Sequence, residues 1–253
     1  MPKEGGGPLA DAVWPQVPAA ALVLVPVGST EQHGPHLPLS TDTVIAEAVA
    51  AGAAAALRPR LDTPVLVAPP IAFGASGEHA GFPGTVSIGH EALRAVLVET
   101  VRSLALWAGR VVFVNGHGGN VPTLDAAVGR MRAEGHDVAW AGCEAPGGDA
   151  HAGFTETSVM LHLAPHLVRP FGGVRGDDRP LPDLMPELVA RGVRAVSPSG
   201  VLGDPAGASA EEGRRIAAAM VASLTGRIAC GRADERGRLA APAVPSPSAE
   251  PRR

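Results

Sequence analysis

Short apolar runs alternate along this chain with longer segments of helical composition or spacing. The runs, rich in Val, Leu and Ala, predict strands buried on both faces, as parallel sheets require, at 21–27, 64–68, 110–114 and 138–141. The segments between them predict helices at 42–57, 91–108 and 120–134. The order β-α-β-α-β-α-β, with short connections, predicts an α/β fold: a three-layer α/β/α sandwich with a mainly parallel sheet.

The two ends of the chain differ in composition from its middle. Residues 1–18 are rich in Gly, Pro and Ala, and residues 231–253 end in Pro, Ser and Arg. Neither end has an apolar periodicity, so we expect a flexible N-terminal tail over 1–18, one folded domain over 19–230 and a disordered C-terminal tail over 231–253. A last helix at 211–228 is expected on the outside of the domain.

Composition and charge argue against several classes of partner. The 253 residues are 45% hydrophobic and carry a formal net charge of −4 without a block of lysines, which argues against nucleic acid and against an anionic membrane surface. The longest wholly apolar run, 19–27, is far shorter than the ~18 residues that a membrane span needs. Cys143 and Cys230 are isolated, which favours a reducing compartment, so we expect a cytoplasmic protein.

A carboxylate, an imidazole and a second carboxylate follow the first predicted strand. Glu31 and His33 are two residues apart in a loop, so an extended chain points both to one side. Asp42 stands at the start of the first predicted helix. Together the three side chains form a ligand set suited to zinc or iron(II) that leaves positions open for water. The alternative is that Asp42 caps the helix and the other two belong to a solvated loop.

A histidine between glycines follows the third predicted strand, in the run Asn115-Gly-His117-Gly-Gly-Asn120. The glycines allow a ligand to approach the backbone closely, which makes His117 a further candidate metal ligand. Asn115 and Asn120 are expected to fix this loop by side-chain hydrogen bonds. The alternative is a turn that binds phosphate through its main-chain amides, although such a turn needs no histidine.

Two other segments add acidic and histidine side chains. His151 and Glu156 precede an amphipathic stretch at 159–163, where Glu156 either joins a site or only favours the positive end of a helix. Glu78 and His79 lie in a Gly-containing segment after the second predicted strand, where they either line the site or are exposed. Because ligands of open α/β sheets bind beyond the carboxyl ends of the strands, we expect these loops to assemble one site.

Several motifs in this chain are similar to those of the creatininase family of metal-dependent amidohydrolases. They are Glu31-x-His33-Gly-x-His36-Leu-Pro-Leu-x-x-Asp42, Phe82-Pro-Gly-Thr85, Asn115-Gly-His117 and His151-Ala-Gly-x-x-Glu156-Thr-Ser. The resemblance spans most of residues 22–225. Within the family, the stretches 74–79, 84–89 and 200–205 resemble those of members that cleave a small ribosomally made precursor peptide.

The resemblance implies a fold, an assembly and a site for two metal ions. The fold is an α/β/α sandwich that assembles into a ring-like homo-oligomer, a hexamer or an octamer. Glu31 and His117 are expected to bind one divalent ion, His33 the other, and Asp42 both. Zinc or iron(II) is expected, with manganese as a further option.

The resemblance also assigns roles to the remaining candidates. Creatininase itself has a glutamate ligand two residues after the histidine that matches His117, where this chain has Gly119, so Glu156 is expected to complete the shell of the second ion. His151 resembles the proton-shuttling histidine of the family and is expected to protonate the leaving amine. Substrate contacts are expected from Glu78 and His79.

The substrate implied by the resemblance is a precursor peptide whose C-terminal Val-Tyr has been decarboxylated and cross-linked. The chain would hydrolyse the bond before that valine and release the modified dipeptide. One alternative is a related enzyme that hydrolyses a small cyclic amide or a formamide. Another is a non-catalytic module that presents the peptide to a partner enzyme and uses metal structurally, although the additional His151 argues against it.

Overall fold

The four predicted strands form one parallel sheet in a computed structural model, which describes residues 7–242. The strands are β1 (Leu22–Val27), β2 (Val65–Val67), β3 (Arg110–Asn115) and β4 (Val138–Gly142), in the order β2-β1-β3-β4. Leu22 pairs with Val65 on one side and with Arg110 on the other. The connection after β1 crosses one face of the sheet through α1 to β2, and the connection after β3 crosses the other face through α3 to β4. In such a topology the loops after β1 and β3 diverge and leave a crevice at the carboxyl edge of the sheet.

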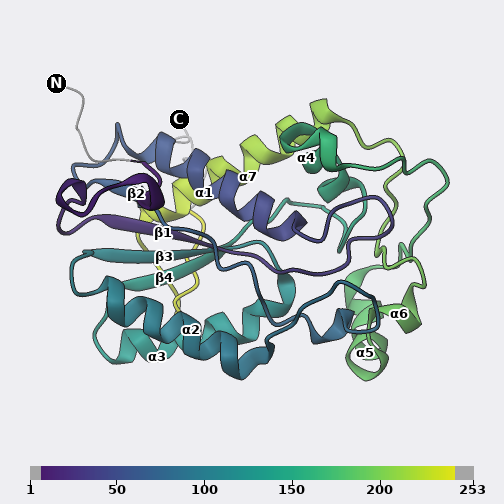
Figure 1. Ribbon diagram of the computed structural model, residues 1–253, viewed down its shortest axis with the longest axis horizontal. Coiled ribbons are helices and arrows are strands. Elements are labelled where there is room, and N and C mark those ends of the chain that lie inside the picture. Colours follow the sequence, from purple (N-terminus) through teal and green to yellow (C-terminus); the bar gives the residue numbers. More distant parts are fainter. Residues whose placement is uncertain (1–6, 243–253) are drawn as a thin grey trace, which may run out of the picture.

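Helices cover both faces of the sheet, which confirms the predicted sandwich. Figure 1 shows the first layer, with α1 (Thr41–Leu57), α4 (Phe154–Leu163) and α7 (Ala210–Cys230) over one face. The other face carries α2 (Gly89–Leu104) and α3 (Val121–Ala133). None of the helices in the described residues is long and apolar enough to cross a membrane.

The side chains of β1 supply both halves of the core. Leu22 and Leu24 pack with α1, α4 and α7, whereas Val23 and Val25 pack with α2 and α3. All four are at most 3% exposed. Burial on both faces is the reason that this strand reads as a continuous apolar run rather than as an alternation of apolar and polar residues.

Described segments on both sides of the predicted domain of 19–230 pack against the sheet. Within the range 7–242, the main-chain carbonyl of Gly7 accepts a hydrogen bond from Val67 in β2 (3.2 Å). At the other edge, the Trp140 amide in β4 donates to Gly237 (2.9 Å), and Leu239 is buried. These segments cover the unpaired edges of the sheet. The packed unit therefore extends beyond 19–230 on both sides, while residues 1–6 and 243–253 of the predicted tails lie outside the described residues.

Two helices that the sequence pattern did not predict stand at the crevice end of the molecule. They are α5 (Leu181–Arg191) and α6 (Val193–Val196), apart from both helix layers in Figure 1. Prolines obscure the helical pattern of α5, because Pro182 occupies its first turn and Pro186 its interior. Gly192, with φ of 74°, separates the two helices.

Candidate metal centre

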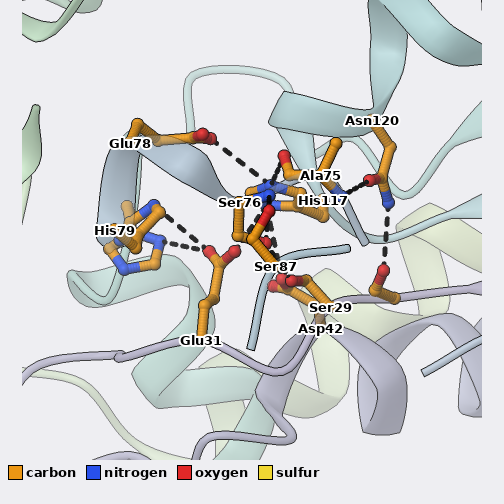
Figure 2. A network of polar contacts seen from close by, with 12 residues as sticks. Ser29, Glu31, Asp42, Ala75, Ser76, Glu78, His79, Ser87, His117 and Asn120 are labelled. Atoms are coloured by element: carbon orange, nitrogen blue, oxygen red, sulfur yellow. Dashed lines mark hydrogen bonds and ion pairs between the residues drawn. The ribbon is translucent and has the colours of Figure 1, made fainter. Parts of the chain in front are cut away.

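Asn120 joins the loops that follow three neighbouring strands. Its side-chain amide donates to the Gly28 carbonyl after β1 (3.0 Å) and to Asn115 Oδ1 at the end of β3 (3.2 Å). Its Oδ1 accepts from the Ala75 amide after β2 (2.9 Å), as Figure 2 shows. The predicted role of Asn120 in fixing the loop is therefore observed, and it extends to the other two strand ends.

A first cluster consists of Glu31, Asp42 and His117. Glu31 Oε2 lies 3.2 Å and Asp42 Oδ2 3.4 Å from His117 Nδ1. The three residues are at most 5% exposed, so the solvated-loop alternative is wrong for Glu31. Asp42 is the second residue of α1 and its carboxylate faces the histidines, which also argues against the helix-cap alternative.

A second cluster consists of His33, His151 and Glu156. His33 Nε2 lies 3.8 Å from Glu156 Oε2 and 3.0 Å from Asp42 Oδ1, so the two oxygens of Asp42 face different clusters. The His33 and His151 rings stack at 4.3 Å between centroids. Glu156 comes from the first turn of α4, where its Oε2 also accepts a hydrogen bond from the Ala152 amide (2.6 Å).

Main-chain carbonyls hold the far side of the histidine rings. His33 Nδ1 donates to the Glu31 carbonyl (3.1 Å), and His117 Nε2 donates to the Ala75 carbonyl (3.2 Å). In each neutral ring the nitrogen that faces the carboxylates is then left with its lone pair. This is the orientation in which histidines ligate metal ions.

Glu78 and His79 contact the first cluster as well as lining a cavity. Glu78 Oε1 lies 3.4 Å from His117 Nε2, and His79 Nε2 lies 3.3 Å from Glu31 Oε1. Figure 2 shows Glu31 between the rings of His79 and His117, with Glu78 pointing at His117. A Cβ on Gly119 would collide with the Glu78 carboxylate, so Glu78 takes up the space beside His117 that a side chain at Gly119 would need.

The buried carboxylates and histidines of the site shift one another's pKa values. Burial alone raises the pKa of Glu31, but His117, His79 and His33 hold it well below its ordinary value. Burial alone lowers the pKa of His33, but Asp42 and the two glutamates raise it to about 10. Burial raises the pKa of Glu156 to about 7, with Asp42 adding to the rise and His33 opposing it. Burial and the neighbouring histidines depress the pKa of His151. Positive charge at the centre of the site therefore stabilises the buried carboxylates.

Three buried carboxylate oxygens test whether this residue set fits a metal. Both oxygens of Glu31 and Oδ2 of Asp42 have no hydrogen-bond partner within the range 7–242. Leaving anionic oxygens unpaired in the interior costs several kcal/mol, roughly the penalty that a bound cation removes. Carboxylate oxygens and imidazole nitrogens are also the donors that zinc, iron(II) and manganese accept. The residues fit a divalent metal ion.

A cavity of about 810 Å³ opens over the first cluster and is lined by Glu78, His79 and His151. Its outer wall comes from α5 and α6, through Leu181, Met185 and other apolar side chains. A second cavity of about 490 Å³ borders it, and Glu156 and Leu181 line both. The candidate metal centre is thus open to a molecule larger than a single amino acid.

The family model for creatininase, described as creatinine amidohydrolase, matches residues 10–228. This chain belongs to the creatininase family. As a member, it is a metal-dependent amidohydrolase, and solved creatininases include a mutant of Zn-Zn type and one described as creatininase Mn. The putative creatinine amidohydrolase of Bacteroides fragilis superposes with a TM-score of 0.75 at 28% identity, covering 88% of this chain and 95% of that one.

Two curated relatives within the family are more similar in sequence. The mycofactocin precursor peptide peptidase of Mycobacterium tuberculosis is 56% identical over 229 residues, covering 88% of this chain and 91% of the relative. The protein of the same name from Mycolicibacterium smegmatis is 56% identical over 218 residues, covering 86% and 88%.

All eight candidate residues predicted from the sequence meet at this site, but two other parts of the site were not predicted. One is the apolar wall from α5, whose prolines obscured it. The other is Gln32, which lies between two candidate ligands in the sequence, and neighbouring residues of an extended chain face opposite sides. Instead its amide contacts His79 and His151. The sequence feature related to the position of Gln32 is Gly200, because a side chain at that position would collide with Gln32.

Proposed function

We propose that this creatininase-family chain is a metal-dependent peptidase of mycofactocin biosynthesis. It hydrolyses the modified mycofactocin precursor peptide before the valine of its C-terminal Val-Tyr and releases the cross-linked dipeptide derived from these two residues. The observation that carries the proposal is the 56% identity, over most of both chains, to peptidases named for that substrate.

Two divalent ions per subunit, zinc or iron(II) with manganese as an option, would be held by the residues of the two clusters. Glu31, Asp42 and His117 would hold one ion, and Asp42, His33 and Glu156 the other. The two oxygens of Asp42, each facing a different histidine, support its shared role. When bound, the ions supply an activated water near neutral pH and polarise the scissile carbonyl.

His151 would move the proton of the reaction. Its Nε2 donates to the Gln32 main-chain carbonyl (2.9 Å), so in the neutral ring Nδ1 carries the lone pair and faces the first cluster, 3.7 Å from Glu31 Oε1. As the peptide C–N bond breaks, the oxygen of water joins the acyl carbon. His151 takes one proton of that water at Nδ1 and passes it to the leaving amine.

The two adjoining cavities support a peptide substrate. A small cyclic amide fills only a fraction of the larger one, about 810 Å³ in volume. A peptide bond placed at the metal residues has a cavity to either side, since Glu156 borders both. Glu78 and His79 line the larger cavity and would contact the substrate there.

We also propose a ring-like homo-oligomer, hexamer or octamer, in the cytoplasm. The support for this assembly is the resemblance of the chain to the creatininase family. Light scattering coupled to size-exclusion chromatography tests the assembly.

The proposal is tested by metal analysis of the purified chain together with mass spectrometry of its reactions. The substrates are the cross-linked peptide, the unmodified peptide, and a panel of cyclic amides and formamides, each with and without a chelator. We expect chelator-sensitive release of the dipeptide from the cross-linked peptide alone. Cleavage of a cyclic amide or formamide with both peptides left intact would favour the alternative enzyme. Bound metal with no cleavage at all would favour a presenting module.

A further inference from the structure

Gln32 has a buried side-chain amide with contacts on every side. Its Oε1 accepts a hydrogen bond from the Gly34 amide (2.9 Å). Its Nε2 lies 2.9 Å from the Gly200 carbonyl, 2.9 Å from His79 Nδ1 and 3.0 Å from His151 Nε2. The residue is 5% exposed.

Main-chain groups fix the orientation of this amide. The Gly34 N–H can only donate and the Gly200 carbonyl can only accept, so Oε1 faces the former and Nε2 the latter. In the opposite orientation the Gln32 Nε2 donor would face the Gly34 N–H, and the Oε1 acceptor would face the Gly200 carbonyl. One hydrogen of Nε2 is used on Gly200, and a single hydrogen remains for the two histidines.

His79 is the histidine that receives this remaining hydrogen. His151 Nε2 lies 2.9 Å from the Gln32 main-chain carbonyl, which can only accept, so this nitrogen carries its own proton and cannot accept another. The second hydrogen of Gln32 Nε2 therefore goes to His79 Nδ1 (2.9 Å). A neutral His79 then has its proton on Nε2, the nitrogen that lies 3.3 Å from Glu31 Oε1.

His79 thus differs from the other histidines of the site. In their neutral forms, His33, His117 and His151 each donate from the far nitrogen to a main-chain carbonyl and turn a lone pair toward the carboxylates. His79 accepts at its far nitrogen and turns an N–H toward them. Glu31, His79 and His151 also lie close enough together to hold a metal ion, but a ring nitrogen that carries a proton cannot be a ligand.

We propose that Gln32 is a positioning residue that fixes the tautomer of His79, so that His79 turns an N–H toward Glu31 Oε1 and is excluded as a third metal-binding histidine. Glu31 Oε2 then remains available to the ion held by the first cluster. The metal-binding part of this inference rests on the proposed function. The tautomer itself requires neither metal nor substrate.

The loop at 200–205 explains why the arrangement depends on the tertiary fold. Gly200 has φ of 83°, and a Cβ there would collide with the Gln32 side chain. Two residues on, Leu202 forms main-chain hydrogen bonds in both directions with His151 (3.0 and 2.9 Å). One loop therefore holds the Gln32 amide and the His151 backbone together.

Nitrogen-15 NMR of histidine-labelled protein at pH 8 tests the tautomer, in metal-free and cadmium-loaded protein. His79→Gln identifies the His79 signals. We expect His79 to be protonated at Nε2 in both states, and cadmium-113 coupling to ring nitrogens of His33 and His117 but not of His79. The His79→Gln variant is expected to bind the same number of ions as the parent chain. Coupling to His79, or the loss of one ion in the variant, would overturn the exclusion.

Gln32→Met tests whether Gln32 is the cause, because methionine has a similar length and no amide. We expect the His79 proton to distribute between both ring nitrogens, whereas Gln16→Met, a change at an exposed glutamine, leaves the spectrum unchanged. An unaltered His79 tautomer in folded Gln32→Met would contradict the proposal. If Gln32→Met does not fold, the spectrum of the parent chain still tests the tautomer of His79. The number of ions bound by His79→Gln still tests whether His79 is excluded as a ligand. Failure to cleave the peptide would affect none of these spectra, so the two proposals fail separately.

Discussion

The two clusters of the candidate metal centre are held in different ways. The first comes from the loop after β1, the first turn of α1 and the end of β3, which sheet pairing brings together. Its residues are at most 5% exposed. The second relies on the segment before α4, and the Glu156 side chain is 18% exposed. Sheet topology therefore determines the first cluster, while contacts between loops determine the second.

Backbone strain is confined to the second of these regions. Ala152, between His151 and Glu156, has φ of 53°, a left-handed conformation that costs an L-residue ~1–2 kcal/mol. It is fully buried, and its amide donates to Glu156. Packing and this hydrogen bond offset the strain and aim the Glu156 carboxylate at His33. The second cluster is thus the one that depends on tertiary contacts for its shape.

Asp42→Asn should have the largest effect, because Asp42 faces both clusters. We expect both ions to bind poorly and peptide cleavage to fall at least about a thousandfold, roughly 4 kcal/mol of lost transition-state stabilisation. Metal analysis and the cleavage assay measure this. Asp137→Asn, at an exposed carboxylate paired with Arg110, serves as the matched control. If Asp42→Asn still binds both ions fully, Asp42 does not hold both of them.

His151→Ala separates proton transfer from metal binding in the second cluster. The variant is expected to retain its metal and to lose about 10²- to 10⁴-fold in kcat, the usual contribution of a general acid or base. Metal content and kcat are measured on the same preparation. His162→Ala, at an exposed histidine of α4, is the control. Near-normal turnover of His151→Ala would refute its assignment.

Glu156→Gln and Glu31→Gln compare the clusters directly. Each change removes a charge at one cluster and nearly preserves its shape. We expect each variant to lose affinity for one ion, by a factor on the order of 10–100 or more, while the other ion stays bound. Metal titrations monitored by calorimetry measure the affinity for each of the two ions. If Glu156→Gln binds both ions as the parent chain does, Glu156 does not complete the second shell.

His36 should make the support of the second cluster sensitive to acid. Its Nε2 hydrogen-bonds Thr157 Oγ1 (2.8 Å), next to Glu156, and its Nδ1 is buried without a partner in the described chain. Burial, with a smaller effect of His33, lowers the pKa of His36 from 6.5 to about 4. Between these pH values the unfolded chain binds a proton that the folded chain does not, so stability falls as pH falls.

The loss should be about 2 kcal/mol between pH 7.5 and pH 5, from the shift to about 4. Urea unfolding at the two pH values measures it. His36→Gln cannot titrate and should lose less stability than the parent chain over the same interval. An equal loss in both proteins would show that another group is responsible.

Local patterns in the sequence were sufficient for most of the fold. The strand at 21–27 and the helix at 42–57 were predicted within a residue or so of β1 and α1, because burial on both faces and an alanine-rich composition are properties of neighbouring residues. Glu31 and His117 could be grouped for a related reason, since strand ends in a parallel sheet meet at one edge. Helix α5 was missed, because prolines weaken a helical pattern whether or not packing overcomes them.

What the sequence by itself determined was the identity of the chemical groups and the strand ends from which they come. Only the tertiary structure decided how those groups face one another. Gln32 meets His151 across 119 residues of chain and Gly200 across 168, and the segments at Gly7 and Gly237 pair with the edges of the sheet. Such contacts leave no local periodicity, because they depend on how separate loops pack together after the sheet has formed.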